Sequence, residues 1–364
     1  MYEQRRQFFN NLTDNKELLG IEIGALDRPL VVRDELSEGS EILYADHLST
    51  ADLKRKYEAD STVNLNALVE VDIICDTGDL CTSLDGRLVD YIVASHVVEH
   101  IPNPIRWFQM LFDVLRPGGF VFLVVPDKRF TFDFQRPTTT YGEMLESFLA
   151  NKKMPSIKDV FDHYSSAVMI DGSRVWNGVL GREELVPLAS NKDALKYAYE
   201  VHNNSTYHDV HISIFTPLSF FSIIKNLIET DILMLEISGF EDTSINDIEF
   251  FVCLKKPQDG VDHVKEVCLA SLPILPLHSL TSPYMPQVAS LSESLRKITD
   301  VHQGFQNSFV RLEADKQHQN NQMELLEKEL RVSQQVLSRR SVRGLLAAIH
   351  FVCLIFSFFR RKGS

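Results

Sequence analysis

The feature that most constrains the fold is a regular alternation of short apolar runs and helical patterns over residues 1–256. Five runs rich in β-branched residues predict strands at 18–23, 41–44, 71–75, 89–94 and 120–125. Helical patterns lie between them, for example at 50–57 and 104–115. A strand-then-helix order predicts a parallel sheet with helices on both faces, and the near-continuous apolar character of the strands agrees with burial on both sides.

A segment of mixed aromatic and polar content, residues 127–207, interrupts this alternation. Its pattern predicts helices at 140–151, 156–164 and 191–201. The alternation then resumes with predicted strands at 210–215, 232–237 and 248–254, and with a helix at 217–230 that Pro217 opens. We therefore expect residues 127–207 to be an insertion at the C-terminal edge of the sheet, where open α/β sheets bind ligands.

The composition changes after residue 256. Five of the 14 prolines lie between residues 257 and 286, which predicts a linker. An apolar heptad repeat follows over 287–338, and ten of its 14 a and d positions are apolar, as is typical of a coiled coil. We expect this segment to make a homo-oligomer; the alternative is a long amphipathic helix packed on its own domain.

The last segment, residues 339–364, combines basic and apolar residues. A 15-residue apolar run at 345–359 has three basic residues on each side. As a helix it would be about 22 Å long, shorter than the ~30 Å hydrocarbon core of a bilayer. Basic flanks favour an anionic membrane surface, so we expect the tail to associate with one; a buried C-terminal helix is the alternative.

The charge distribution excludes one class of function. The chain has 37 basic and 50 acidic residues, a net charge of −13, which argues against a nucleic-acid partner. Residues 330–364 nevertheless hold seven of the basic residues and none of the acidic ones. Five scattered cysteines predict neither a disulfide framework nor a zinc site, and the N-terminus has no secretory signal pattern, so we expect a cytoplasmic protein at the inner face of the membrane.

Acidic residues and a glycine follow the first three predicted strands. The first strand ends in Glu22-Ile23-Gly24, where a glycine lets the backbone approach a ligand, although an ordinary strand-to-loop turn explains it equally well. Asp46 follows the second strand, where an acid commonly binds ribose hydroxyls. Asp76 ends the third strand and can accept a hydrogen bond from an adenine amino group. Further on, residues 116–119 (RPGG) predict a tight helix-to-strand turn.

Taken in order, the segments IEIG, YAD, ICDTGDL, ASHVVEHIPNP and LRPGGFVFLVVPD resemble the class I S-adenosylmethionine-dependent methyltransferases of the type 11 branch, over about residues 15–256. The resemblance implies a Rossmann-like seven-stranded sheet whose last strand, 248–254, is antiparallel and lies between the two before it. It also implies S-adenosylmethionine as cofactor. The chain departs from the family in the first loop, where Ala25 follows Gly24 in place of further glycines.

The resemblance also assigns cofactor contacts by position. The methionine part would lie at Glu22 and Gly24, and the ribose at Asp46. The adenine would lie at Asp76, with Thr77 and Leu80 beside the ring, and the sulfonium would lie beside Ser95 and His96.

Methyl transfer from a sulfonium is an in-line displacement, so the protein chiefly supplies proximity and orientation. A hydroxyl acceptor must also lose its proton, for which histidine or a carboxylate is the usual base. The spacing of His208 and His211 could suggest a metal, but a strand would place them on opposite faces, so we predict no metal site. The candidate bases are His96, Asp127, His208, Asp209 and His211, whereas a structural role is favoured for His100.

The stretch VPDKRFTFDFQRPTTT is similar to a subgroup of these methyltransferases associated with surface-polysaccharide synthesis. Arg129 and Arg136 could hold a sugar or phosphate there, or could pair with Asp127 and Asp133 to fix the insertion. We expect O-methylation of a sugar or terminal phosphate of a lipid-linked glycan. The alternatives are a small-molecule or quinone-like acceptor, and a catalytically idle scaffold organised by the coiled coil.

Overall fold

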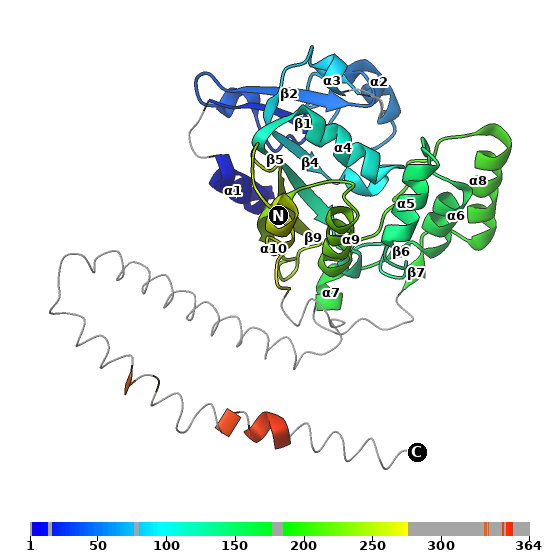
Figure 1. Ribbon diagram of the computed structural model, residues 1–364. Helices are drawn as coiled ribbons and strands as arrows, with labels where there is room; N and C mark the ends of the chain where they lie inside the picture. Colours follow the sequence, from blue (N-terminus) through cyan, green and yellow to red (C-terminus); the bar gives the residue numbers. More distant parts are fainter. Residues whose placement is uncertain are drawn as a thin grey trace. The chain divides into compact units, whose positions relative to one another are not determined.

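The computed structural model describes residues 2–13, 17–75, 80–176 and 185–275, and ten helical positions between 331 and 351 (Figure 1). The predicted coiled coil and tail lie almost entirely outside the described residues, as do Asp76 and Thr77, so these assignments stay predictions. Within the described part of the chain, no helix has both the length and the apolar character needed to cross a bilayer.

One mixed sheet forms the centre of the described domain. Its strands are β1 (Leu19–Ile23), β2 (Glu41–Asp46), β3 (Ile73–Ile74), β4 (Val89–Ser95), β5 (Leu115–Pro126), β8 (Glu236–Glu241) and β9 (Glu249–Lys255). Their order is β3-β2-β1-β4-β5-β9-β8. The first five strands pair in parallel, and β9 is antiparallel to both β5 and β8. This confirms the predicted seven-stranded, Rossmann-like sheet with its inserted antiparallel strand.

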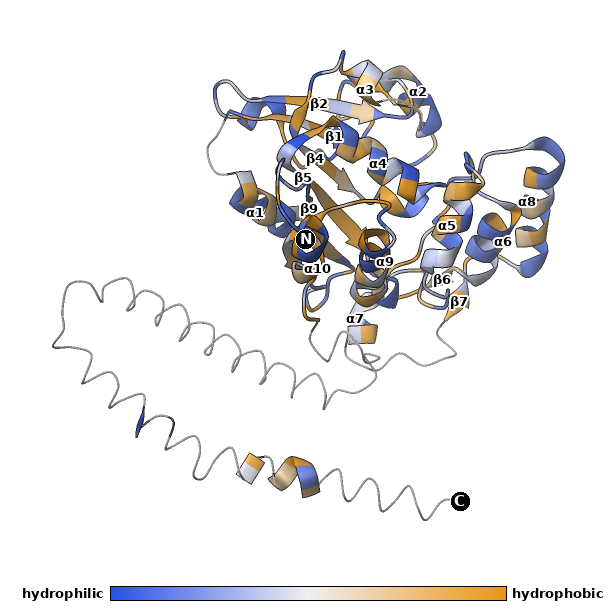
Figure 2. Cartoon of the chain, viewed as in Figure 1, coloured by the Kyte–Doolittle hydropathy of each residue, from blue (hydrophilic) through white to orange (hydrophobic). Residues whose placement is uncertain are grey.

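The alternating side chains of the central strands supply two apolar cores. In β5, Val121, Leu123 and Val125 enter one core. Phe122 and Val124 enter the other core on the opposite face. All five are fully buried, as a strand covered on both faces requires. Figure 2 shows the hydrophobic colouring of the central strands.

Helices cover both faces. The first core is closed by α3 (Leu80–Ser83), α4 (Pro104–Val114), α9 (Pro217–Glu229) and α10 (Val264–Ala270). The N-terminal helix α1 (Tyr2–Thr13) brings Phe8 and Phe9 to the second core. A further helix, α2 (Thr50–Lys56), follows β2 and begins at Ser49, whose side chain caps the backbone amide of Asp52.

The predicted insertion forms a helical group beside the sheet (Figure 1). Its helices are α5 (Tyr141–Leu149), α6 (Ile157–Ser166), α7 (Gly172–Trp176) and α8 (Asn191–Asn204), with a small sheet of β6 (Val168–Met169) and β7 (Val186–Pro187). Capping boxes at Thr140 and Ser156 start α5 and α6 close to the predicted positions. The three helices expected from the sequence are therefore confirmed.

Three predicted local features differ from the structure. The run 210–215 is extended but pairs only through an isolated bridge of Phe215 to Asp127, because it passes over the strand ends instead of joining the sheet. The strand predicted at 232–237 begins at Glu236. Residues 116–119 bulge out of β5, whose register jumps from Leu115 to Phe120, so they are not a turn before the strand.

Helix α10 lies inside the segment for which proline content predicts a linker. Its Cys268 is fully buried, and the helix contacts α9 and β8. No proline falls between residues 258 and 272, which leaves room for one short helix. This part of the segment therefore packs on the domain, which extends the described fold beyond the predicted boundary at 256.

Candidate active site

The carboxyl ends of β1, β2 and β4 meet at one edge of the sheet, as parallel strands require. Gly24 follows β1 with a φ of +70°, and its amide donates to the carbonyl of Ala45, 2.9 Å away. A Cβ at this position would lie 3.1 Å from Cγ2 of Val97. The backbone therefore passes close to the segment after β4, where a side chain would intrude on the edge.

Glu22 lies at the same edge, but its side chain is buried against the protein backbone. Its carboxylate accepts backbone hydrogen bonds from Leu30 at 2.6 Å and Val31 at 2.9 Å, and the residue is 2% exposed. Burial raises the pKa of Glu22 to about 7, although the two backbone hydrogen bonds oppose that rise. Glu22 therefore fixes the loop that follows Gly24. Its predicted contact with the methionine part of the cofactor stays a prediction.

Asp46 is the last residue of β2, and its carboxylate is buried. Its Oδ1 lies 2.6 Å from Nδ1 of His47, yet it has no hydrogen-bond partner among the described residues. A buried oxygen without such a partner is unfavourable unless a ligand donates to it, which fits the predicted ribose hydroxyl. Leu80 is fully buried in the core at the start of α3, directly after the undescribed residues 76–79.

Ser95 and His96 follow β4 and are joined to two distant residues. Nε2 of His96 lies 2.8 Å from Oε2 of Glu249. Arg5 donates from Nε to Oε1 of Glu249 at 2.5 Å and from a terminal nitrogen to Oγ of Ser95 at 3.2 Å. Burial raises the pKa of Glu249, but the hydrogen bonds from His96 and Arg5 outweigh it and hold that pKa below its usual value. An ionised Glu249 therefore orients His96, which has a positive φ of 54°.

Two more predicted bases lie near His96, and one lies apart. Nδ1 of His211 is 2.5 Å from Oδ2 of Asp133. Asp209 lies 2.9 Å from Nδ1 of His100, and this contact lowers the pKa of Asp209. His208 instead faces Glu200 at 3.3 Å and packs among tyrosines of the insertion. The structure thus groups His96, Asp209 and His211 and separates His208 from them.

The sequence left two roles open for Arg129 and Arg136: binding a sugar or phosphate, or pairing with Asp127 and Asp133. The structure shows the pairing. The fully buried Asp127 accepts hydrogen bonds from Arg129 and, at 2.9 Å, from Oγ1 of Thr243. Arg136 is 4% exposed and donates to Asp133 at 2.7 Å. These contacts favour a role for Asp127 in anchoring the insertion over its predicted role as a base. The two arginines are held by carboxylates, as the pairing hypothesis expects.

Sequence reasoning missed Arg5 and Glu249, and it left Glu99 without a role. Glu249, which is 1% exposed, could have been noticed, because it begins a strand whose next five residues are apolar. Nothing in the pattern of α1 distinguishes Arg5 from Arg6, since only the fold brings one of them to β9.

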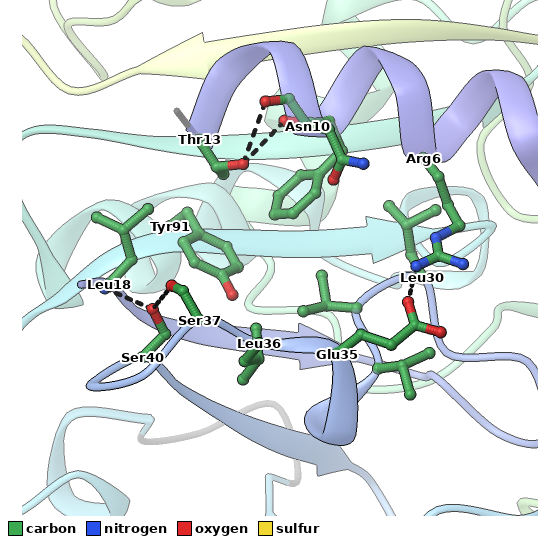
Figure 3. Close-up of a pocket in the computed structure, with 13 residues that line it drawn as sticks. Arg6, Asn10, Thr13, Leu18, Leu30, Glu35, Leu36, Ser37, Ser40 and Tyr91 are labelled. Atoms are coloured by element: carbon green, nitrogen blue, oxygen red, sulfur yellow. Dashed lines mark hydrogen bonds and ion pairs between the residues drawn. The ribbon is translucent and has the colours of Figure 1, made fainter. Parts of the chain in front are cut away.

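Two cavities of about 320 Å³ lie in the described domain. Figure 3 shows the first, between α1 and residues 30–40; its lining includes Arg6, Asn10, Glu35 and Tyr91 but none of the predicted cofactor residues. The second lies in the insertion and adjoins residues 212–214. Its lining is highly polar and includes Arg136, Glu143, Lys152, Lys158, Asp159 and Asp162.

Residues 29–225 match the model of a methyltransferase-domain family. This match spans more than half of the chain, so the protein belongs to that methyltransferase-domain family, as the sequence motifs predict. S-adenosylmethionine is its cofactor, and two features of the edge fit it: the close backbone at Gly24 and the unbonded oxygen of Asp46. No curated protein matches the chain in sequence.

Solved structures similar to this chain include three methyltransferases. The CurJ carbon methyltransferase is 12% identical, with 69% of this chain and 51% of that chain covered and a TM-score of 0.34. An S-adenosylmethionine-dependent methyltransferase of Methanosarcina mazei is 14% identical, with 69% and 98% covered and a TM-score of 0.35. The plantazolicin methyltransferase BpumL, solved with S-adenosylhomocysteine, is 12% identical, with 71% and 83% covered and a TM-score of 0.36. The chain spans about half the length of the first.

Proposed function

We propose that the protein methylates a sugar hydroxyl or a terminal phosphate of a lipid-linked glycan at the inner face of the membrane. The observation that carries the substrate class is the charged cavity of the insertion. Arg136, Lys152 and Lys158 line it together with hydroxyl groups such as those of Thr138, Thr139 and Ser147. The lining also holds Glu143, Glu146, Asp159 and Asp162, so it offers hydrogen-bonding groups of both signs. Such a lining suits a polar ligand such as a sugar, whereas a quinone ring would favour an apolar pocket.

The cofactor, when bound, supplies an electrophilic methyl group on a sulfonium. A hydroxyl acceptor loses its proton as its oxygen bonds to the methyl carbon and the C–S electron pair stays on sulfur. We assign that proton to His96, because Glu249 lies 2.8 Å from its Nε2 and Nδ1, 3.5 Å from the buried Glu99, is the ring nitrogen that can accept it. Its side chain is 31% exposed at the end of β4. A phosphate acceptor needs no base.

The proposed location rests on the tail. The run at 345–359 is apolar and has arginine or lysine at 339, 340, 343, 360, 361 and 362. This composition suits a helix lying in an anionic interface. The heptads at 287–338 support a homo-oligomer, which would present several tails to one surface and strengthen binding.

A two-stage assay tests the activity. We expect calorimetry to detect S-adenosylmethionine binding, and methyl-labelled cofactor to label extracted lipid-linked glycans but not a quinone fraction. Absence of cofactor binding at millimolar concentration would favour the scaffold alternative. Label found only in the quinone fraction would overturn the proposed acceptor.

A pair of lysine variants tests the acceptor cavity. Lys158 lines it, and its side chain is 66% exposed; Lys225 is 54% exposed and lies on α9 outside the cavity lining. Lys158→Ala should raise KM for an anionic acceptor severalfold and leave the Kd for the cofactor unchanged. Lys225→Ala should change neither constant. Equal effects of the two substitutions would contradict a role for this cavity in acceptor binding.

Vesicle flotation tests the tail. The full chain should float with vesicles that contain anionic lipid, and a chain shortened to end at Ser338 should not. Neutral substitutions at Arg360, Arg361 and Lys362 should weaken flotation and reduce its salt dependence. If the shortened chain floats as well as the full one, the anchor lies elsewhere.

A further inference from the structure

Glu99 is a buried carboxylate without a hydrogen-bonding role. It lies in the 3-10 turn η2 (Val98–His100) directly after β4, and the residue is 0% exposed. Neither Oε1 nor Oε2 has a hydrogen-bond partner among the residues that the structure describes. Its backbone carbonyl, in contrast, accepts the amides of Ile212 and Ser213 at 2.7 and 3.0 Å. Burial of an unbonded carboxylate is strongly unfavourable unless a cation neutralises it.

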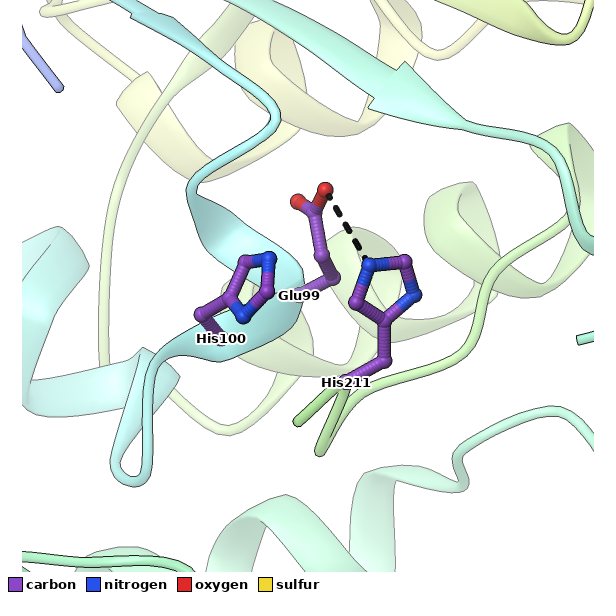
Figure 4. Close-up of side chains that lie close together, drawn as sticks. All are labelled: Glu99, His100 and His211. Atoms are coloured by element: carbon purple, nitrogen blue, oxygen red, sulfur yellow. Dashed lines mark ion pairs between the residues drawn. The ribbon is translucent and has the colours of Figure 1, made fainter. Parts of the chain in front are cut away.

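Three histidines surround this carboxylate. Nδ1 of His96 lies 3.5 Å, and Nε2 of His211 lies 3.9 Å, from Oε1 of Glu99. Figure 4 shows the rings of His100 and His211 on either side of Glu99, each with a nitrogen turned toward its carboxylate. One ligand atom each from Glu99, His100 and His211 all lie within 4.8 Å of one another.

A separate carboxylate contacts one ring nitrogen of each histidine. Glu249 lies 2.8 Å from Nε2 of His96, Asp209 lies 2.9 Å from Nδ1 of His100, and Asp133 lies 2.5 Å from Nδ1 of His211. Metal-binding histidines are oriented in this way, because a carboxylate on one ring nitrogen leaves the other as a lone-pair donor. Nε2 of His211 and the other ring nitrogen of His100 are therefore oriented toward one point beside Glu99.

We propose that Glu99, His100 and His211 bind one divalent transition-metal ion, such as Zn²⁺ or Mn²⁺. Two imidazoles and one carboxylate suit such ions, and three protein ligands leave a coordination position open. Ligand atoms around one tetrahedral ion lie about 3.4 Å apart, so binding would draw the three side chains slightly inward. The sequence argument against a metal tested only His208 with His211, whereas these ligands come from segments more than 100 residues apart.

The open coordination position gives the ion a role in methyl transfer. This part of the inference rests on the proposed function. Glu99 and His96 follow the same strand end, so the ion lies beside the proposed base. An acceptor hydroxyl bound to the ion would have a lower pKa and would release its proton to His96. A phosphate acceptor would bind the ion directly through an oxygen.

Metal titration of the full-length protein after treatment with a chelator tests the site. We expect calorimetry to show one Mn²⁺ or Zn²⁺ per chain, and Glu99→Gln or His211→Asn to weaken its binding by about 10–100-fold. His202→Asn and Glu200→Gln, on α8, serve as matched controls and should leave metal affinity unchanged. Electron paramagnetic resonance of Mn²⁺ added to the unmutated protein gives a readout that does not depend on variants.

The outcomes separate this inference from the proposed function. No loss of the free Mn²⁺ signal and no calorimetric Zn²⁺ binding would overturn the metal site, as would unchanged affinity in a folded Glu99→Gln variant. Cofactor affinity, measured on the same samples, should be the same with and without metal. If the cofactor fails to bind while the metal binds, the proposed methyl transfer fails but the metal site stands.

Discussion

The two halves of the active-site edge are built in different ways. On the predicted cofactor side, Glu22 and Gly24 lie at the end of β1 and Asp46 ends β2. On the proposed acceptor side, Arg5 and Glu249 meet across 244 residues of chain, and His96 contacts both of them. Local sequence is therefore enough to build the first half, whereas the second half exists only when α1 packs beside the ends of β4 and β9.

The two halves also differ in the partners, and hence the pKa, of their buried carboxyl groups. Glu22 binds backbone amides, so its environment is neutral and its pKa rises with burial. Glu249 is equally buried but has a guanidinium and an imidazole as partners, so its pKa falls. The cofactor side thus tolerates a protonated carboxyl group, and the acceptor side depends on charged pairs. A substitution in one half should therefore change the binding or reaction at that half and leave the other half unchanged.

The largest effect is expected from Glu249→Gln. The substitution removes the charge that pairs with Arg5 and His96, and loss of one partner of a buried ion pair destabilises a protein by about 3–5 kcal/mol. Methyl transfer to a hydroxyl should fall by about 10²–10⁴-fold, because His96 loses its orienting carboxylate. Denaturant unfolding and steady-state kinetics measure the two effects.

Glu229→Gln is the control for this variant, because Glu229 pairs with Lys225 on the surface of α9. It should change the free energy of unfolding by at most about 0.5 kcal/mol and leave activity intact. Cofactor affinity should be unchanged in both variants. A loss of cofactor affinity in Glu249→Gln would show that the two halves are coupled.

A smaller effect should come from the pH dependence of stability at Glu22. Burial raises its pKa from the ordinary value of 4.5 to about 7 in the folded protein. The folded state therefore keeps a proton that the unfolded state has lost between these values. Stability from Glu22 is fully present below pH 4.5 and falls as pH rises toward 7, by on the order of 3 kcal/mol.

Unfolding titrations across this pH window, on the wild type and on Glu22→Gln, check the prediction. The variant carries no titrating group at this position, so its profile should lack the decrease that the wild type shows. Parallel profiles would mean that Glu22 titrates normally, and that its buried environment does not control the loop after Gly24.

The smallest effect is expected from glycine substitutions. Gly24 and Gly86 have φ values of +70° and +74°, so alanine at either position should destabilise the protein by about 1–2 kcal/mol. Only Gly24 has a neighbour that a Cβ would meet, at 3.1 Å, whereas nothing lies within 4 Å at Gly86. Gly24→Ala should weaken cofactor binding by about tenfold in calorimetry, and Gly86→Ala should not. Equal cofactor affinities would remove Gly24 from the cofactor site.

Much of the fold could be predicted because its signals are local. The strand positions, the insertion helices and the order of the sheet follow from apolar periodicity, caps and family motifs. The clearest error is the run 210–215, which alternates like a strand, but the amides of Ile212 and Ser213 bind the carbonyl of Glu99 instead of a neighbouring strand. Periodicity reports which side chains are buried and does not report which backbone they pair with.

The sequence by itself determined the family and the cofactor, and it located the residues predicted to bind that cofactor, because each of them is placed by the strand that it ends or follows. Only the tertiary structure decided the acceptor half. It paired Arg129 and Arg136 with aspartates, set His208 apart, and gathered Glu99, His100 and His211 around one point. The physical reason is that a buried charge must find its partner in space, and the chain offers no local pattern that records which distant residue will arrive there.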